Sequence, residues 1–160
     1  MATITKLGIP DPSNQLGAAP YGNLTAFRYV LKTIASGAVE GGDSTTAVAS
    51  GDTVKIGLLP AGFRLIDSEI IVKTGLTATI TAKAGFAYAD GVDSTDVPQD
   101  DDFFGTGIAV ATAGRYRNAT SNASVTLPKE AWLTLTTAVA ANAKASELEI
   151  IVFAINEGVA

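Results

Sequence analysis

The sequence predicts an all-β protein: an antiparallel β-sandwich or jelly roll of about eight strands with an extended N-terminal arm. Apolar and polar residues alternate strictly from Leu76 to Tyr88, which is typical of a long strand with one buried face. Similar runs recur along the chain, and clusters of Gly, Pro, Asn or Asp separate them. No convincing amphipathic helix of ten residues is present. We therefore expect a β-sandwich domain at residues 25–160, preceded by an arm at residues 1–24.

The arm is predicted to be extended. Pro10, Pro12 and Pro20 prevent a helix or a central strand in this segment. The segment is nevertheless too apolar for a solvated tail, so it can lie on another subunit or surface, or it can pack on its own domain. We predict partner contacts for its apolar side chains: Ile4, Leu7, Ile9, Leu16 and Tyr21.

Two strands are expected before residue 60, at residues 24–35 and 52–59. The Gly- and Ser-rich segment between them predicts a flexible loop, which could hold a short strand at residues 45–49. The buried faces are expected to hold Phe27, Tyr29 and Leu31 in the first strand and Val54, Ile56 and Leu58 in the second.

A turn is predicted at residues 60–62, because Pro presets φ and Gly adds backbone freedom. The next strand covers residues 63–74, and the alternating strand at residues 76–88 follows Gly75. We expect the strands at residues 52–59, 63–74 and 76–88 to be consecutive antiparallel neighbours. The buried face of the middle strand is expected to hold Ile66, Ile70 and Val72.

The second half of the domain is predicted to contain a long acidic loop and four strands. The loop covers residues 90–107, and a polar segment covers residues 114–122. The last strand carries apolar residues on both faces, which favours burial of its C-terminal half on both sides. The four strands are expected at residues 107–113, 123–127, 131–138 and 146–156.

Composition excludes several classes of function. The 160 residues include no His and no Cys, which excludes a Ser-His-Asp triad, a Cys nucleophile and a His/Cys zinc site. The net charge is −5, but six of the 16 acids lie between Asp90 and Asp102, so the charge is local. No apolar run is long enough to span a membrane, and the N-terminus does not resemble a signal peptide. We expect a protein that is not an enzyme, takes no cofactor, and binds neither nucleic acid nor membrane.

The acidic loop offers the hard oxygen ligands that Ca²⁺ prefers, with Asp100, Asp101 and Asp102 as the candidate ligands. Its spacing does not match an EF-hand loop, and no bidentate Glu follows. A solvated loop, or an acidic patch that meets a basic partner, is the simpler interpretation, so we assign no metal.

Paired carboxylates occur on two predicted strands, at Glu147 and Glu149 and at Asp67 and Glu69. Such pairs can cleave glycosidic bonds, but they are also the ordinary solvent face of a strand. No aromatic platform lies near Glu147 and Glu149 in the sequence, which favours the structural interpretation.

One small basic and aromatic cluster is formed by Arg115, Tyr116 and Arg117. Two arginines are too few for useful affinity for nucleic acid, because that affinity scales with the phosphates neutralised. Arg and Tyr are common anchors of protein interfaces, so we predict that these three residues contact a protein partner.

Residues 52–72 read DTVKIGLLPAGFRLIDSEIIV, and residues 77–85 read TATITAKAG. A strand here ends in Leu-Pro-Ala-Gly, a second strand follows, and a Thr- and Ala-rich strand comes next. Over residues 50–90 the chain thereby resembles a pattern that is common in structural proteins of tailed bacteriophages. No functional residue is carried over, because the similar segment is framework.

Within that group the chain is most similar to capsid decoration (cement) proteins. The resemblance implies a virion structural protein on the outer surface of the capsid, made in the host cytoplasm. It also implies binding to the major capsid protein of an HK97-type shell, and self-association as a trimer or dimer. The alternatives are a phage tail or head-fibre component, or a carbohydrate-binding β-sandwich module.

Overall fold

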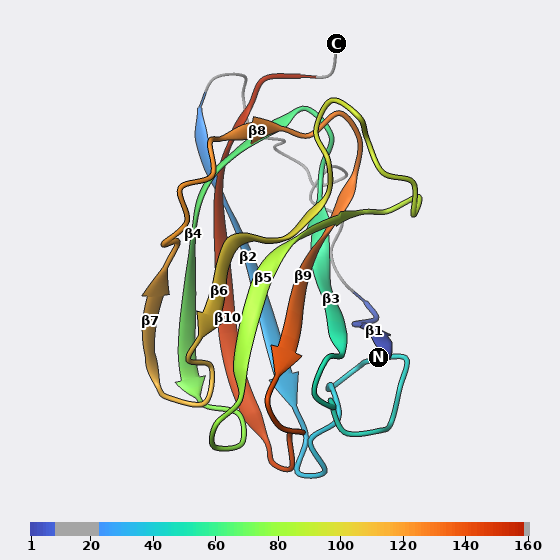
Figure 1. Cartoon of the computed structure of the whole chain (residues 1–160), viewed down its shortest axis with the longest axis vertical. Coiled ribbons are helices and arrows are strands. Elements are labelled where there is room, and N and C mark those ends of the chain that lie inside the picture. Colours follow the sequence, from blue (N-terminus) through green and yellow to red (C-terminus); the bar gives the residue numbers. More distant parts are fainter. Residues whose placement is uncertain (9–22, 159–160) are drawn as a thin grey trace.

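The computed structural model describes residues 1–8 and 23–158, which form ten β-strands in two sheets packed face to face (Figure 1). The predicted all-β sandwich is confirmed, but the strand count of about eight is too low. Three strands were not expected from the sequence, namely β1 (Thr3–Thr5), β6 (Asp100–Ile108) and β7 (Gly114–Arg117), while the strand expected at residues 107–113 does not form. In this part of the chain there is no helix long and apolar enough to cross a membrane.

The first sheet has the order β1-β3-β9-β5-β6. Its neighbours are antiparallel except for β1, which runs parallel to β3. The sheet therefore places β9 at its centre, between β3 and β5. The bounds of the other four strands are β3 (Thr53–Leu59), β9 (Ala131–Ala138), β5 (Thr81–Tyr88) and β6 (Asp100–Ile108).

The second sheet has the order β2-β10-β4-β7, and a short strand, β8, also pairs with β4. The strands β3, β4 and β5 do not form consecutive neighbours as expected, because β4 lies in this sheet while β3 and β5 lie in the other. The order of strands in each sheet is therefore set by pairs that lie far apart in the sequence, such as β4 with β10. The bounds are β2 (Leu24–Thr33), β10 (Ser146–Asn156), β4 (Phe63–Thr74) and β8 (Val125–Thr126).

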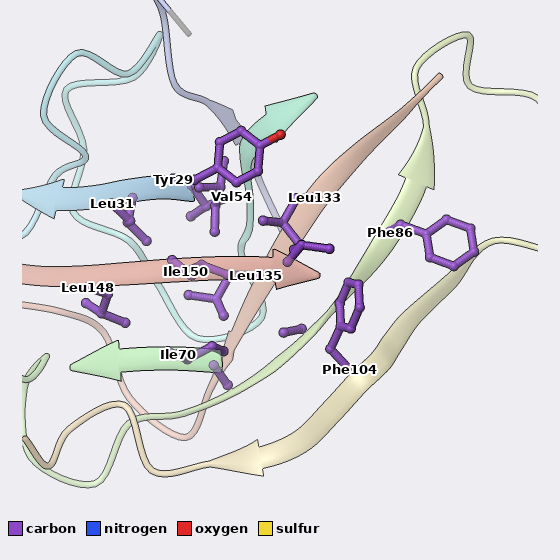
Figure 2. Packing of buried hydrophobic residues seen from close by; sticks show 14 of the residues in the cluster. Tyr29, Leu31, Val54, Ile70, Phe86, Phe104, Leu133, Leu135, Leu148 and Ile150 are labelled. Atoms are coloured by element: carbon purple, nitrogen blue, oxygen red, sulfur yellow. The ribbon is translucent and has the colours of Figure 1, made fainter. Parts of the chain in front are cut away.

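The core lies between the two sheets, and Figure 2 shows part of it. Leu148 and Ile150 of β10 lie on one side of this core, and Leu133 and Leu135 of β9 lie on the other. Full burial of one such side chain stabilises the fold by about 1.5–3 kcal/mol, so this apolar layer is the main source of stability. The buried face predicted for residues 24–35 is confirmed. The burial expected on both sides of the last strand is only partial, because its inward face is buried while Ile151, Phe153 and Ile155 on the other face are half-buried.

Two β-bulges correct the predicted faces of β3 and β4. In β3 the pairing with β9 shifts between Lys55 and Gly57, so Leu59 is buried and Leu58 is only half-buried. In β4 the pairing with β10 skips Ile66, whose side chain is 40% exposed instead of buried. Each bulge adds one residue, and one extra residue moves the following side chains to the other face.

The strand predicted from residue 76 begins at Thr81, because residues 75–80 form a loop in which Thr79 has a φ of 75°. The predicted acidic loop ends early, since β6 starts at Asp100, and residues 107–113 do not form a separate strand. Two register shifts in the pairing of β6 with β5 remove the alternation that would have indicated a strand. The short strand considered at residues 45–49 does not form.

Candidate interaction surfaces and a polar pocket

The first residues of the predicted arm belong to the domain itself. The strand β1 pairs with β3, and Ile4 is 1% exposed within the core. The Ala2 amide donates a hydrogen bond to Asp52 Oδ1 over 2.6 Å. Ile4 therefore packs against its own chain, whereas Leu7 is 59% exposed and remains available to a partner. The predicted contacts Ile9, Leu16 and Tyr21 lie outside the described residues.

The outward face of the second sheet carries a ladder of four ion pairs that crosses its strands. Arg28 on β2 binds both carboxylate oxygens of Glu149 on β10, at 2.6 and 2.8 Å. Arg115 on β7 lies 3.0 Å from Glu69 on β4. The remaining pairs are Lys73 with Glu147 at 2.6 Å and Arg117 with Asp67 at 3.2 Å. The ladder joins each pair of neighbouring strands along the order β2-β10-β4-β7.

The ion pairs of Glu147 and Glu149 argue against a glycosidase role for these two carboxylates. A general acid needs a raised pKa, so that it is protonated when the reaction starts. The hydrogen bond from Arg28 instead lowers the pKa of Glu149, and the hydrogen bond from Lys73 lowers the pKa of Glu147. Both carboxylates are held ionised by a cation, which fits a structural role.

The Arg115-Tyr116-Arg117 cluster is divided between two environments. Arg115 and Arg117 point outward, and their side chains are 64% and 68% exposed. Tyr116 is half-buried against the core, and its hydroxyl donates a hydrogen bond to the carbonyl of Thr112 over 2.9 Å. The two arginine side chains are thus accessible to a partner. The strand β7, which carries them, lies at one edge of the sheet (Figure 1).

The first acids of the predicted acidic loop are engaged in holding the loop. Lys129 donates to both carboxylate oxygens of Asp90, at 3.0 and 2.7 Å, and this hydrogen bonding lowers the pKa of Asp90. Asp93 Oδ1 accepts hydrogen bonds from the amides of Ser94 and Gln99. These two acids therefore stabilise the loop conformation that leads into β6.

The three candidate metal ligands are brought together at the start of β6. Asp100, Asp101 and Asp102 each place one carboxylate oxygen within 4.8 Å of the others. Asp100 Oδ1 accepts a hydrogen bond from the Asp102 amide over 3.0 Å, and Lys83 forms an ion pair with Asp101. The hydrogen bond between the Asp100 and Asp102 carboxyl groups raises the pKa of Asp102.

A polar pocket lies beside this cluster on the outward face of the first sheet. Its lining includes Thr53, Ala87, Gln99, Asp100, Asp101 and Thr134, and its volume is about 390 Å³. Neither Thr134 nor Gln99 carries a signal of a site in its own sequence neighbourhood. The one available signal was Gly85, opposite Thr134, because a glycine inside a strand often marks the close approach of another backbone.

Comparison with known proteins indicates the fold. No protein-family model and no curated protein sequence matches the chain. A solved chain from the capsid of Ralstonia phage GP4 superposes with a TM-score of 0.64 and 19% identity, over 99% of this chain and 100% of that chain. A chain from the capsid asymmetric unit of cyanophage Pam1 gives a TM-score of 0.56 and 16% identity, over 93% and 99%. At this level of identity, the comparison establishes a shared fold over nearly the whole length of each chain.

Proposed function

We propose that this chain is a virion structural protein of a tailed bacteriophage, and more specifically a decoration (cement) protein. In this role it binds the outer surface of the major capsid protein shell and stabilises the head. The observation that carries the proposal is the full-length similarity to a chain of the Ralstonia phage GP4 capsid. The second similarity, to a chain of the cyanophage Pam1 capsid, supports the same role.

The match extends over the whole of the compared capsid chains. It covers 100% of the GP4 chain and 99% of the Pam1 chain. A single β-sandwich suits a unit that is added to the surface of a shell.

The proposed mechanism is burial of surface, without covalent chemistry. The carboxylates Glu147 and Glu149 are ionised and paired, which suits a stable surface better than acid–base catalysis. Within an oligomer, binding of one subunit to the shell raises the effective concentration of the linked subunits for their own sites. We propose that the chain also self-associates, as a trimer or dimer, which would increase this avidity.

Two regions are proposed to make the contacts. The first is the segment after β1, with Leu7, Ile9, Leu16 and Tyr21 as apolar anchors. The second is the β7 edge, where Arg115 and Arg117 stay more than half exposed despite their ion pairs. Arg is enriched at interface hot spots, and an exposed ion pair can exchange its partner at little cost.

The test must distinguish loss of capsid binding through the arm from loss of binding through unfolding of the domain. Deleting residues 1–22 would remove Ile4 from the core, so the better variant replaces Ile9, Leu16 and Tyr21 with Ser and keeps β1. We expect this variant to melt like the wild type but to lose binding to isolated capsids in co-sedimentation. A matched control places Ser at three exposed apolar positions elsewhere on the surface: Ile66, Val92 and Val139. Unchanged capsid binding by the arm variant would contradict the role of the arm.

A further inference from the structure

The start of β6 lies across the outward face of its own sheet. On β5, even-numbered side chains point into the core and odd-numbered ones point outward, so a side chain at Gly85 would point outward. A Cβ atom there would lie 2.1 Å from the Asp100 carbonyl oxygen and 2.5 Å from the Asp101 carbonyl carbon. The backbone of these two acids therefore covers β5 at Gly85, in the space that a larger side chain would fill.

This crossing buries a hydroxyl group that has no partner. Thr134 on β9 lies opposite Gly85 and projects from the outward face, where its neighbour Trp132 is half exposed. Thr134 is nevertheless only 2% exposed, and its Oγ1 has no hydrogen-bond partner among the described residues. An unpaired buried hydroxyl destabilises the fold, so a ligand that accepts this oxygen in the pocket lined by Thr134 would remove the penalty.

The same pocket carries an excess of negative charge. Asp100 and Asp101 line it, and Asp102 places a carboxylate oxygen within 4.8 Å of theirs. Lys83 neutralises one of the three carboxylates by its ion pair with Asp101. Asn122 donates to Asp100 Oδ2 over 3.3 Å but adds no charge. Among the described residues, neither Asp100 nor Asp102 forms an ion pair with a cation, and Asp100 lines the pocket together with the buried hydroxyl of Thr134.

The geometry points to a site for a hard divalent cation of the Ca²⁺ class, held by the carboxylates of Asp100 and Asp102 and by the buried hydroxyl of Thr134. Carboxylate, hydroxyl and carbonyl oxygens are the donors that Ca²⁺ accepts, and it tolerates irregular geometry better than Mg²⁺ does. The pocket volume of about 390 Å³ leaves room for water molecules to complete the shell. The cation would fix the irregular start of β6 to the centre of the first sheet. This inference does not depend on the proposed capsid role.

The first test is titration of the purified full-length chain with CaCl₂ after treatment with EDTA, by calorimetry and by thermal melting. We expect one cation per chain and a Kd on the order of 0.1–1 mM, as in sites with few protein ligands. The melting temperature should rise in 10 mM CaCl₂, and MgCl₂ should act more weakly. No heat of binding and no change in melting temperature would overturn the proposal and leave water as the occupant of the pocket.

Two variants assign the site to these residues. Asp102→Asn removes a ligand charge, and Asp96→Asn is its control, because it removes one charge from the exposed loop that precedes the cluster. Thr134→Val keeps the shape of the side chain and removes the unpaired hydroxyl. We expect T134V to weaken Ca²⁺ binding about tenfold, by loss of a bond to a charged group, while melting no lower than the wild type in EDTA.

Binding of Ca²⁺ by these variants distinguishes a cation site from a cluster of acids that only shapes the start of β6. Loss of Ca²⁺ binding in D102N but not in D96N, together with the effect of T134V, would support the assignment. Lys83→Gln removes the competing ammonium group from Asp101 and should strengthen binding of Ca²⁺. Binding that D102N or T134V leaves unchanged would place the cation elsewhere and overturn the assignment.

Discussion

Substitution of Gly85 by Ala is the most direct perturbation of the packing between β6 and the first sheet. The added Cβ atom would lie 2.1 Å from the Asp100 carbonyl oxygen and 2.8 Å from Asp101 Cα. Ordinary contacts of a Cβ atom begin near 3.4 Å, so the chain must move by more than 1 Å. Because the obstacle is backbone and not the end of a flexible side chain, β6 must shift as a unit.

The magnitude follows from the size of this clash. Overpacking typically costs 1–3 kcal/mol, and a backbone obstacle places G85A near the upper end. Replacing Gly by Ala also stiffens the unfolded chain, which returns about 0.4–1 kcal/mol. We expect a net loss of about 2 kcal/mol, which lowers the melting temperature by about 4–8 °C for a chain of this length.

The assay is thermal melting together with urea unfolding, both in EDTA so that no cation contributes. The control is Gly114→Ala on β7, where the nearest atom to the added Cβ is the Tyr116 hydroxyl oxygen at 3.4 Å. G114A should melt within a degree or two of the wild type. Equal stability of G85A and G114A would refute the proposed crossing of β6 over the sheet.

Three further predictions concern the core, the ion pairs and self-association. Leu135→Ala opens a cavity at a fully buried position between the sheets and should cost about 3–5 kcal/mol in urea unfolding; a loss below 1 kcal/mol would contradict the packing. Glu149 has a folded pKa below its ordinary value of 4.5, so its pair with Arg28 stabilises the fold above pH 4.5, and this contribution is lost as the pH falls through the folded pKa. An NMR titration should therefore show the Glu149 pKa rising toward 4.5 in Arg28→Gln, and an unchanged value would contradict the bidentate pair. Light scattering after size exclusion should give the mass of a trimer or dimer, and a monomer at high concentration would contradict proposed self-association.

The long regular strands could be predicted from the sequence because their alternation matches their burial. Residues 131–138 and 146–156 form the expected strands, and Leu148 and Ile150 point into the core. The bulges could not be predicted, since an extra residue such as Ile66 has the same local pattern as a regular strand position. The predicted faces of β3 and β4 are therefore wrong at Leu58 and Ile66, whereas the other predicted positions of the two strands are buried as expected.

The candidate surfaces were predictable in part. Local sequence identified Arg115 and Arg117, but their partners Glu69 and Asp67 depend on the pairing of β7 with β4, which only the fold defines. The prediction of a partner contact for Ile4 is wrong, because three residues of β1 pair in parallel with β3 and bury it. Such a short parallel pair leaves no periodic signal in the sequence.

The polar pocket depends most strongly on tertiary structure. Asp100, Asp101 and Asp102 were visible as candidate ligands, but Thr134 lies 32 residues or more away in sequence and reaches them only through the irregular pairing of β6. Thr134 alone has the pattern of an ordinary exposed strand residue. The loss of its exposure follows from the backbone that passes over Gly85.

The proposed function assigns this chain to a phage, and immunogold electron microscopy of that phage's intact virions is the most direct test of the proposal. Antibodies against the purified protein should label the outside of the head at many positions. Heads assembled without the protein should lose the label and break at lower temperature. Label confined to the tail or to head fibres, or virions that lack the protein, would contradict the assignment as a capsid decoration protein.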